Sequence, residues 1–398
     1  MRVLVTLAAA LALNGSGTPN ATLTYFLGSP FSGQAGGGLC ALDSEGRTIR
    51  LTDPSGIRGA SWSPDGRLLA FYRVPRAESG FPADIWVSDP NGHAPKNLTS
   101  GYTNFNVDPD WSPDGTRIVF VARSDRSRLV TMNADGSDKR TVAGSATSSD
   151  GVLSDPAWSP DGKWIAYQLT ELPAPSGVVV IPAAGGMPHL VAADSGGADW
   201  SPDSNEIVYG MSGTGIYVVN RDGTGTRLLH ASDAGNVSEY DPSWSPDGRS
   251  LAFVRYVWKP VRAESVLMLM SADGTNARRA AGDWELGASE PAWRPARAAD
   301  HGRPCFVRGS TRANRLVGTN AGDVLLGEGG NDILSGRGGN DLILGGPGHD
   351  VVRGGAGADW LYTPDDARDD VEGGTGYDRA EIDDKDKSSG VEQERPPW

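Results

Sequence analysis

The sequence is poor in the residues that zinc sites and disulfide scaffolds require. It contains two cysteines among 398 residues, Cys40 and Cys305, and neither lies in a Cys-x-x-Cys or mixed Cys/His motif. This spacing argues against a zinc site. It leaves one hypothesis open, a single disulfide between the two cysteines if the protein is exported to an oxidising compartment.

The chain also lacks a hydrophobic run long enough to span a bilayer. The main candidate extends from Val3 to Leu13, about 11 residues against the roughly 20 that a spanning helix needs. Small and polar residues follow it, which is the layout of a short secretory signal peptide. A buried first strand is the alternative, but the alanines of this run are poor strand formers. We therefore predict that residues 1–20 are a signal peptide. The mature chain would be secreted or held in the cell envelope, without an integral membrane segment.

Recognisable catalytic motifs are absent as well. The sequence has no Gly-x-Ser-x-Gly nucleophile elbow and no His-Glu-x-x-His motif, and its five histidines are scattered. Missing motifs leave room for an unfamiliar active site, but an enzyme is not the leading interpretation.

Basic residues, which nucleic-acid binding requires, are scarce in the C-terminal part of the chain. The net charge is −14, and acidic residues outnumber basic ones two to one after Gly309. Such a surface repels phosphates, so nucleic acid is not an expected partner.

Glycine and proline, in contrast, are abundant, with 54 and 27 residues. This composition favours many short strands joined by tight turns. No segment shows a convincing helical hydrophobic period. The expected fold class is therefore all-β.

A five-residue motif, Trp-Ser-Pro-Asp-Gly, recurs along most of the chain. In each copy proline and glycine favour a β-turn, and an apolar strand follows. A second apolar strand then runs into a glycine hairpin such as Asp135-Gly136. Units of this length fit four short strands, the size of one propeller blade. Complete copies begin at Trp62, Trp111, Trp158 and Trp244, and degenerate ones at Trp200 and Trp293, at intervals of 42 to 49 residues.

These repeats resemble those of the TolB-type β-propeller family, over residues 21–296. The resemblance implies a six-bladed propeller. After Trp293 the expected apolar strand is missing, whereas Leu23 to Leu27 is a strand with no motif before it. We therefore predict that this N-terminal segment completes the last blade and closes the ring, which removes exposed sheet edges. Cys40 and Cys305 follow the two halves of that blade, so the hypothetical disulfide would cross the seam.

A second repeat, nine residues long, occupies residues 318–381, after a linker at 297–317. Five consecutive copies start at Gly318, and a sixth follows an insertion from Thr363 to Glu372. The eighth position of the first five copies is aliphatic, which predicts short strands around a narrow core. The sixth-position residues are Asp323, Asp332, Asp341, Asp350, Asp359 and Asp378.

This pattern resembles the calcium-binding nonapeptide repeat of RTX proteins, which form a parallel β-roll with two nonapeptides per turn. The resemblance implies Ca²⁺ as the cofactor and the sixth-position carboxylates as its ligands. Backbone carbonyls near the first glycine of a copy are further candidate ligands, at Gly327, Gly336, Gly345 and Gly354. Residues 18 apart then share an edge, so ions are expected between Asp323 and Asp341, Asp332 and Asp350, and Asp341 and Asp359. The register of Asp378 is left open, folding is expected to depend on calcium, and residues 382–398 are predicted to be an acidic tail.

Four acidic residues stand three positions before a repeat tryptophan, each followed by proline. In a propeller they would recur at equivalent places and could line the central channel. One interpretation is a turn or cap that binds local backbone N–H groups, and the other is a cation or ligand site. These residues are Asp108, Asp155, Asp241 and Glu290.

The leading functional hypothesis is an exported, non-enzymatic calcium-binding protein. Its propeller would be a platform for an unknown protein or carbohydrate ligand. One alternative is a TolB-like envelope or translocation component, although TolB has an α/β domain before its propeller. The other alternative is a hydrolase or lyase with its active site in the propeller channel.

Overall fold

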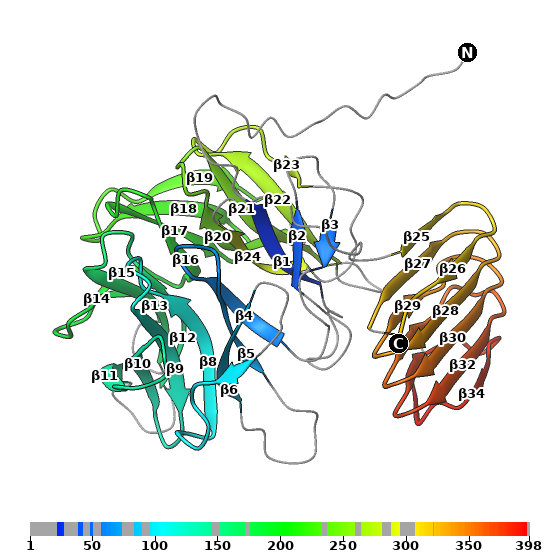
Figure 1. Ribbon diagram of the computed structural model, residues 1–398. Coiled ribbons are helices and arrows are strands. Elements are labelled where there is room, and N and C mark those ends of the chain that lie inside the picture. The colour runs from blue at the N-terminus through cyan, green and yellow to red at the C-terminus, as the bar shows by residue number, and fades with distance from the viewer. Residues whose placement is uncertain are drawn as a thin grey trace.

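The computed structural model describes residues 22–27, 39–42, 48–50, 57–73, 83–89, 95–144, 151–171, 176–232, 237–258, 264–280, 288–294, 307–320 and 322–395. Regular structure in these ranges consists of β-strands, which form a propeller followed by a parallel β-roll (Figure 1). None of these ranges contains a helix long and apolar enough to cross a bilayer. The predicted signal peptide, Cys305 and the side chain of Cys40 lie outside them, so the disulfide stays a prediction.

Five four-stranded antiparallel sheets are each built from consecutive strands. In each sheet the innermost strand ends at a repeat tryptophan, which pairs with the apolar strand after the turn, as Trp111 pairs with Ile118. The sheets are β4–β7 (Ile57–Trp62, Leu69–Arg73, Asp84–Ser88, Lys96–Asn97), β8–β11 (Phe105–Trp111, Arg117–Arg123, Ser127–Asn133, Arg140–Gly144), β12–β15 (Gly151–Trp158, Trp164–Glu171, Gly177–Pro182, His189–Ala193), β16–β19 (Gly196–Trp200, Glu206–Met211, Gly215–Asn220, Arg227–Ala231) and β20–β23 (Val237–Trp244, Ser250–Val257, Glu264–Ser271, Arg278–Arg279).

A further four-stranded sheet joins the two ends of the propeller. Its innermost strand, β24 (Ala288–Arg294), pairs with β1 (Thr22–Leu27), so that Trp293 lies opposite Leu23. β2 (Leu39–Leu42) and β3 (Thr48–Arg50) complete it. Neighbouring innermost strands contact one another around the whole ring, including β24 and β4. The prediction that the N-terminal strand closes the ring is confirmed.

The repeated motif folds as a turn because its serine and aspartate bind the backbone. In the second copy the hydroxyl of Ser112 donates to Asp114 at 2.6 Å, and the same carboxylate oxygen accepts the N–H of Thr116. The N–H of Arg117 then donates back to the Ser112 hydroxyl at 2.9 Å. Equivalent bonds occur in four other copies, so the turn chemistry is encoded locally.

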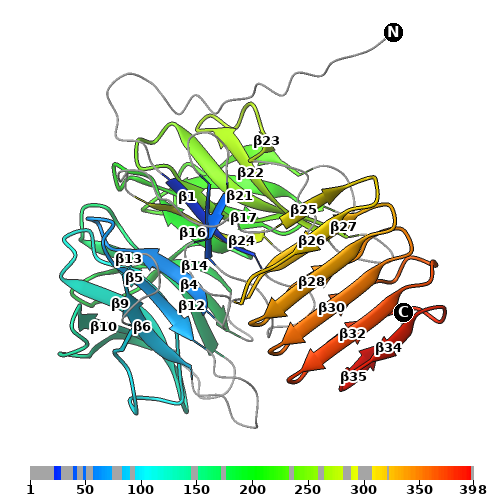
Figure 2. The same cartoon turned by 45° about the vertical axis from the view of Figure 1, so that its right-hand side comes forward.

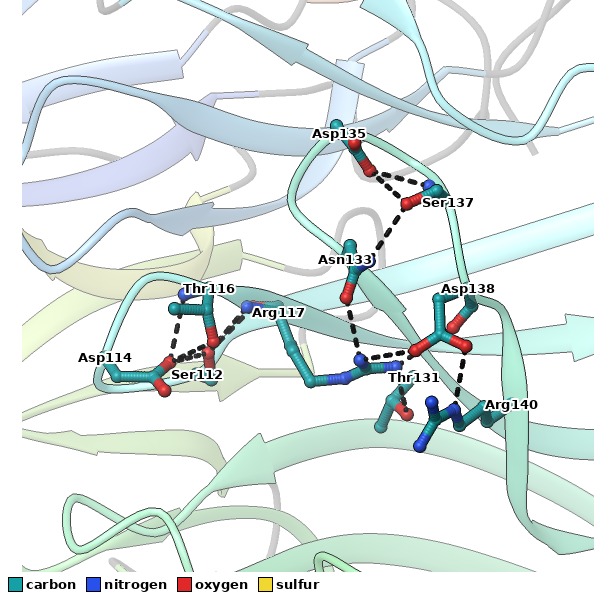
Figure 3. Close-up of polar contacts among 10 residues, drawn as sticks. All are labelled: Ser112, Asp114, Thr116, Arg117, Thr131, Asn133, Asp135, Ser137, Asp138 and Arg140. Atoms are coloured by element: carbon teal, nitrogen blue, oxygen red, sulfur yellow. Dashed lines mark hydrogen bonds and ion pairs between the residues drawn. The ribbon is translucent and has the colours of Figure 1, made fainter.

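Arg117 connects this turn to the hairpin between β10 and β11, which lies at the same end of the blade (Figure 3). Its guanidinium donates to Asn133 at 2.8 Å and to the carboxylate of Asp138 at 3.0 Å. In the hairpin itself, Asp135 accepts both the N–H and the hydroxyl of Ser137. The face that carries these turns is therefore ordered by short-range polar contacts.

The propeller core lies between neighbouring sheets. Phe120, on β9, packs with Ile85 of the preceding sheet, whereas Val121 on the same strand packs with Tyr167 of the following sheet. Alternate residues of one strand thus serve two interfaces. This explains why the central strands are continuous apolar runs, as in sheets covered on both faces.

The C-terminal roll consists of two parallel sheets whose strands alternate along the chain (Figure 2). In the first three turns the register is 18 residues, with Leu325 opposite Ile343 and Leu334 opposite Val352. The eighth-position side chains fill the narrow core between the sheets and have no exposed surface up to Leu361. The six-stranded sheet contains β25 (Val307–Ser310), β27 (Val324–Glu328), β29 (Leu342–Leu344), β31 (Trp360–Tyr362), β33 (Arg379–Glu381) and β35 (Gln393–Arg395). The five-stranded sheet contains β26 (Arg315–Val317), β28 (Ile333–Gly338), β30 (Val351–Ala356), β32 (Asp370–Thr375) and β34 (Lys387–Ser389).

The paired strands extend beyond the boundaries of 318–381 at both ends. β25 and β26 lie in the predicted linker, yet they pair with β27 and β28. β34 and β35 lie in the predicted acidic tail, yet they pair with β32 and β33. The nonapeptide consensus underestimates the roll because a parallel strand needs backbone pairing and one inward side chain, not a perfect repeat.

Candidate metal centre

Each aspartate at the sixth position of a nonapeptide lies just before a strand of the roll. One carboxylate oxygen of Asp341 accepts the backbone N–H of Asp323, one coil turn earlier, at 2.6 Å. The N–H of Asp341 in turn donates to Asp359 at 2.8 Å. The same contact joins the N–H of Asp332 to Asp350 at 2.8 Å. The structure therefore stacks the pairs that the 18-residue spacing predicts to be neighbours.

The acidic side chains form two continuous stacks, one along each sheet. Seven of the nine expose 7% or less of their surface, which is unusual for carboxylates. The long ladder, on the six-stranded sheet, consists of Asp323, Asp341, Asp359, Asp378 and Glu392. The short ladder, on the five-stranded sheet, consists of Asp332, Asp350, Asp369 and Asp386.

Sequence reasoning missed three ladder members, Asp369, Asp386 and Glu392. Asp369 lies in the segment interpreted as an insertion, but that segment is a ten-residue repeat that still completes a turn of the coil. The N–H of Asp350 donates to Asp369 at 2.7 Å, and the side chain of Val371 enters the core two residues later. The retained Asp-x-Val spacing was the available signal.

The environment of the second carboxylate oxygen distinguishes a metal site from a simple turn cap. In Asp332, Asp350 and Asp369 this oxygen is buried and accepts no hydrogen bond among the described residues. An orphaned buried charged oxygen costs at least on the order of 1–3 kcal/mol, so a nearby cation would stabilise it. Calcium accepts carboxylate and carbonyl oxygens together, and the residues present therefore fit it. No three Asp, Glu, His or Cys side chains of the described ranges form a metal-binding group, so carbonyl oxygens would have to complete the shell.

The first glycine of each nonapeptide allows the backbone to approach the carboxylate. A Cβ on Gly336 would lie 2.0 Å from the second oxygen of Asp341 and 2.6 Å from the carbonyl oxygen of Gly354. Any side chain there would push the Asp341 carboxylate out of this position. The four glycines proposed to supply carbonyls all stand in this way beside the aspartate of their own copy: Gly327, Gly336, Gly345 and Gly354.

The electrostatics of the short ladder favour a bound cation. The pKa of Asp350 is raised to about 6, chiefly by burial and with added repulsion from the neighbouring Asp332 and Asp365. Burial also raises the pKa of Asp369 to about 7, with Asp386 among the carboxylates that add to the effect. Stacked carboxylates at this depth hold protons unless positive charge is supplied.

In the propeller, the predicted channel residues occupy equivalent bulges of the innermost strands. Asp108, Asp155 and Asp241 have φ values of 53°, 49° and 50°, and the pairing register shifts at each of them. Gly59 and Gly197 hold the same place in two other sheets, with φ of 53° and 59°. An acidic side chain is therefore not needed to form the bulge.

The structure brings two of the four channel residues together. The pKa of Asp108 is raised to about 7, chiefly by burial and then by the charge of Asp155, while the nearby Arg123 opposes the rise. Burial raises the pKa of Asp155 as well. Asp241 lies two sheets further around the ring, on β20, and the side chain of Glu290 is outside the described residues.

Two aspartates that the sequence did not single out connect neighbouring blades. Asp110 accepts the hydroxyl of Ser61 from the preceding sheet and the N–H of Trp158 from the following one, each at 2.7 Å. Asp199 accepts the N–H of Trp244 at 2.7 Å. Both stand directly before a repeat tryptophan, and their bonds give them a structural role.

Comparison with known families agrees with this architecture. A model of the TolB β-propeller domain matches residues 116–256, and a model of the RTX calcium-binding nonapeptide repeat matches residues 308–343, 335–364 and 344–380. The chain combines a TolB-type propeller with an RTX repeat module. The RTX repeats indicate calcium binding, and their matches cover the ladder from Asp323 to Asp378.

Relatives of the TolB-type propeller share its fold over part of their length. The chain is 24% identical over 220 residues to the uncharacterized peptidase YuxL of Bacillus subtilis (strain 168), and 29% identical over 219 residues to the uncharacterized protein Atu1656 of Agrobacterium fabrum (strain C58). Each match covers 54% of this chain, but only 31% and 60% of the respective relative. The crystal structure of TolB from Acinetobacter baumannii has a TM-score of 0.55 at 18% identity, covering 70% of this chain and 68% of that one. At this identity the likeness shows the fold alone.

Proposed function

We propose that this protein is an exported calcium-binding protein in which the RTX module is stabilised by calcium and the TolB-type propeller binds a protein or carbohydrate ligand. The observation that carries the calcium assignment is the pair of buried ladders, in which one oxygen of a carboxylate caps a backbone N–H and the other is turned to no donor in Asp332, Asp350 and Asp369. A pure turn cap would not bury that second oxygen.

Each part of the repeat has a defined role in this proposal. The aspartates Asp323, Asp332, Asp341, Asp350, Asp359 and Asp378 would be the carboxylate ligands, with Asp369 added to them. The first glycines would leave space for the carboxylates and aim carbonyl oxygens at the same edge. Bound calcium would supply the positive charge that the stacked carboxylates lack. Sites of this kind, in flexible loops, belong to the weak extracellular range of about 10⁻⁴ to 10⁻³ M.

A calcium titration of the full chain tests this proposal. Circular dichroism and calorimetry should show the roll unfolded in chelator and folded in millimolar calcium, because ligand binding to the folded state alone stabilises it. Asp350→Asn should weaken binding, whereas Asp384→Asn makes the same charge change at an exposed residue and should not. Identical melts with calcium and with chelator would refute the proposal.

The envelope and enzyme alternatives depend on the propeller. The envelope alternative predicts a partner among envelope proteins, which a pull-down would identify. The match to the peptidase YuxL covers 31% of that protein, so hydrolase activity is not carried over to this chain. Turnover of a peptide or oligosaccharide library would overturn the non-enzymatic proposal.

The channel carboxylates support a second binding proposal, for a cationic ligand at Asp108 and Asp155. These two carboxylates interact across adjacent blades and share one nearby arginine, so one negative charge is left unbalanced when both are ionised. In a divalent-cation titration, replacing both by asparagine should remove one site while the calcium-dependent melt of the roll is unchanged. Unchanged stoichiometry would assign these residues to turn capping.

A further inference from the structure

The outer faces of the two roll sheets differ in a way that the RTX consensus does not prescribe. Positions seven and nine of the nonapeptide flank the inward eighth residue, so their side chains lie on the outer face. On the six-stranded sheet these positions are apolar for three successive rungs: Val324 and Leu326, Leu342 and Leu344, and Trp360 and Tyr362. On the five-stranded sheet the corresponding pairs include Ile333 with Ser335, Val351 with Arg353, and Asp370 with Glu372.

Burial follows the same division. Val324, Leu342 and Trp360 expose 3%, 5% and 6% of their surface and form one apolar cluster with Leu326. Ile333, at the same repeat position on the other sheet, is 37% exposed. The outer face of the six-stranded sheet is therefore far less exposed at these positions than the outer face of the five-stranded sheet.

The six-stranded sheet is the one that lies nearer the propeller. In Figure 1, β25, β27 and β29 lie on the side of the roll nearer the propeller, and β28, β30 and β32 lie on the far side. Figure 2 shows the five-stranded sheet in front, turned away from the propeller. The apolar part of this face ends at Trp360. The guanidinium carbon of Arg379 lies over the Trp360 ring, 6.0 Å from its centroid, so the cluster has a charged edge.

We propose that the outer face of the six-stranded sheet, formed by Val324, Leu326, Leu342 and Trp360, docks the roll onto the propeller of the same chain. Residues 295–306 connect β24 to β25, and a connection this short gives an effective concentration in the millimolar range. A modest apolar surface is then sufficient to hold the two units together. The proposal rests on the calcium-binding function, because the docking face exists only when the roll is folded. Binding of calcium to the roll therefore raises the thermal stability of the propeller.

The chain offers a matched pair of variants for the test. Leu342→Asp and Ile333→Asp make the same change at the same repeat position, on the covered and the exposed sheet. In calorimetry of the full chain, calcium should raise the propeller transition by about 2–4 °C in the wild type and in Ile333→Asp. In Leu342→Asp that rise should be lost while calcium stoichiometry is retained. An unchanged rise in Leu342→Asp would overturn the proposal.

A second measurement does not depend on the variant folding. Small-angle scattering of the wild-type chain in calcium should give the maximum dimension of two touching domains. The dimension of separated domains would overturn the proposal, and so would a calcium-dependent dimer in sedimentation velocity that Leu342→Asp dissolves, since the face would then bind a second copy. A chain that binds no calcium would refute the proposed function instead, whereas normal calcium binding with an unshifted propeller would refute the docking alone.

Discussion

At the scale of single residues, position within a ladder decides how much a carboxylate contributes. Asp341 contacts the backbone of one neighbour and is contacted by the next, so it would serve two ion positions. Asp323 begins the long ladder, and its second oxygen already accepts the N–H of Thr319 at 2.6 Å and the hydroxyl at 2.9 Å. Equal residues in the sequence repeat are therefore unequal in the fold.

The first prediction compares these two residues. Asp341→Ala should lower calcium stoichiometry and the calcium-dependent melting temperature more than Asp323→Ala, because one change affects two neighbouring ion positions and the other a terminal one. Isothermal titration and thermal unfolding in calcium measure both effects. A larger loss for Asp323→Ala would contradict the 18-residue pairing of ligands.

The second prediction concerns the blade connector Asp110. The surrounding protein raises its pKa from 3.8 to about 6. The folded state thus binds the proton more tightly than the unfolded state, and this stabilisation is present below pH 4 and lost as the pH rises through 6. Between pH 4 and 7 the propeller should lose on the order of 1–3 kcal/mol of unfolding free energy from this group.

Asparagine removes the titration and keeps most contacts, since its amide can donate to Ser61 and its oxygen can accept from Trp158. Asp110→Asn should therefore flatten the pH dependence of the propeller transition in denaturant unfolding. Asp199→Asn provides a second, independent test, because burial raises the pKa of Asp199 to about 6 as well. An unaltered pH profile in both variants would exclude these carboxylates as its source.

At the scale of elements, the roll depends on close approach of neighbouring turns. Its sheets are parallel and its core is one side chain thick, so each turn gains stability mainly from the turns beside it. The glycine stacks and the carboxylate ladders run along the same edges, so the backbone geometry fixes the position of the carboxylates. A steric change in one turn should therefore reduce calcium binding.

The third prediction uses two glycines of strand β28. Gly336→Ala would place a methyl group 2.0 Å from the Asp341 carboxylate, whereas at Gly338 the nearest atom is 3.6 Å away. We expect Gly336→Ala to reduce calcium affinity by at least about tenfold and Gly338→Ala to change it little, as backbone overlap costs more than about 1.4 kcal/mol per such contact. Terbium luminescence or calorimetric titration distinguishes them. Equal affinities would show that the glycine edge is not part of the site.

At the scale of the whole molecule, the charge on the roll sets its response to pH. Without calcium, the raised pKa values of Asp350 and Asp369 mean that protonation stabilises the folded roll below about pH 4. This stabilisation is lost as the pH rises through 6 to 7. Calcium requires the deprotonated carboxylates, so it stabilises the roll most where protons no longer do.

The fourth prediction follows from that competition. Calcium affinity of the full chain should weaken by at least about tenfold between pH 7.5 and 5.5, and binding at pH 6.5 should release protons. Titrations in buffers of different ionisation enthalpy measure both quantities. An affinity independent of pH over this interval would show that the ladder carboxylates are not the ligands.

The sequence by itself determined the two repeat types, because turns and strand periods are local. The Ser-Pro-Asp-Gly turn closes through bonds within five residues, and the aspartate and aliphatic positions of the nonapeptide follow from spacing alone. From these follow the fold class, the closing role of Leu23 to Leu27 and the pairing of Asp341 with its neighbours. Local pattern failed where a repeat was imperfect, as at Asp369.

Only the tertiary structure decided which chain elements meet. It showed that the roll extends over β25 and β35, that Asp110 joins two blades, and that Asp108 and Asp155 are neighbours while Asp241 is not. It also buried one outer face of the roll and exposed the other, although Leu342 and Ile333 hold the same position in their repeats. The physical reason is that burial and electrostatic coupling depend on what packs against a residue from far along the chain, and a repeat consensus does not contain that information.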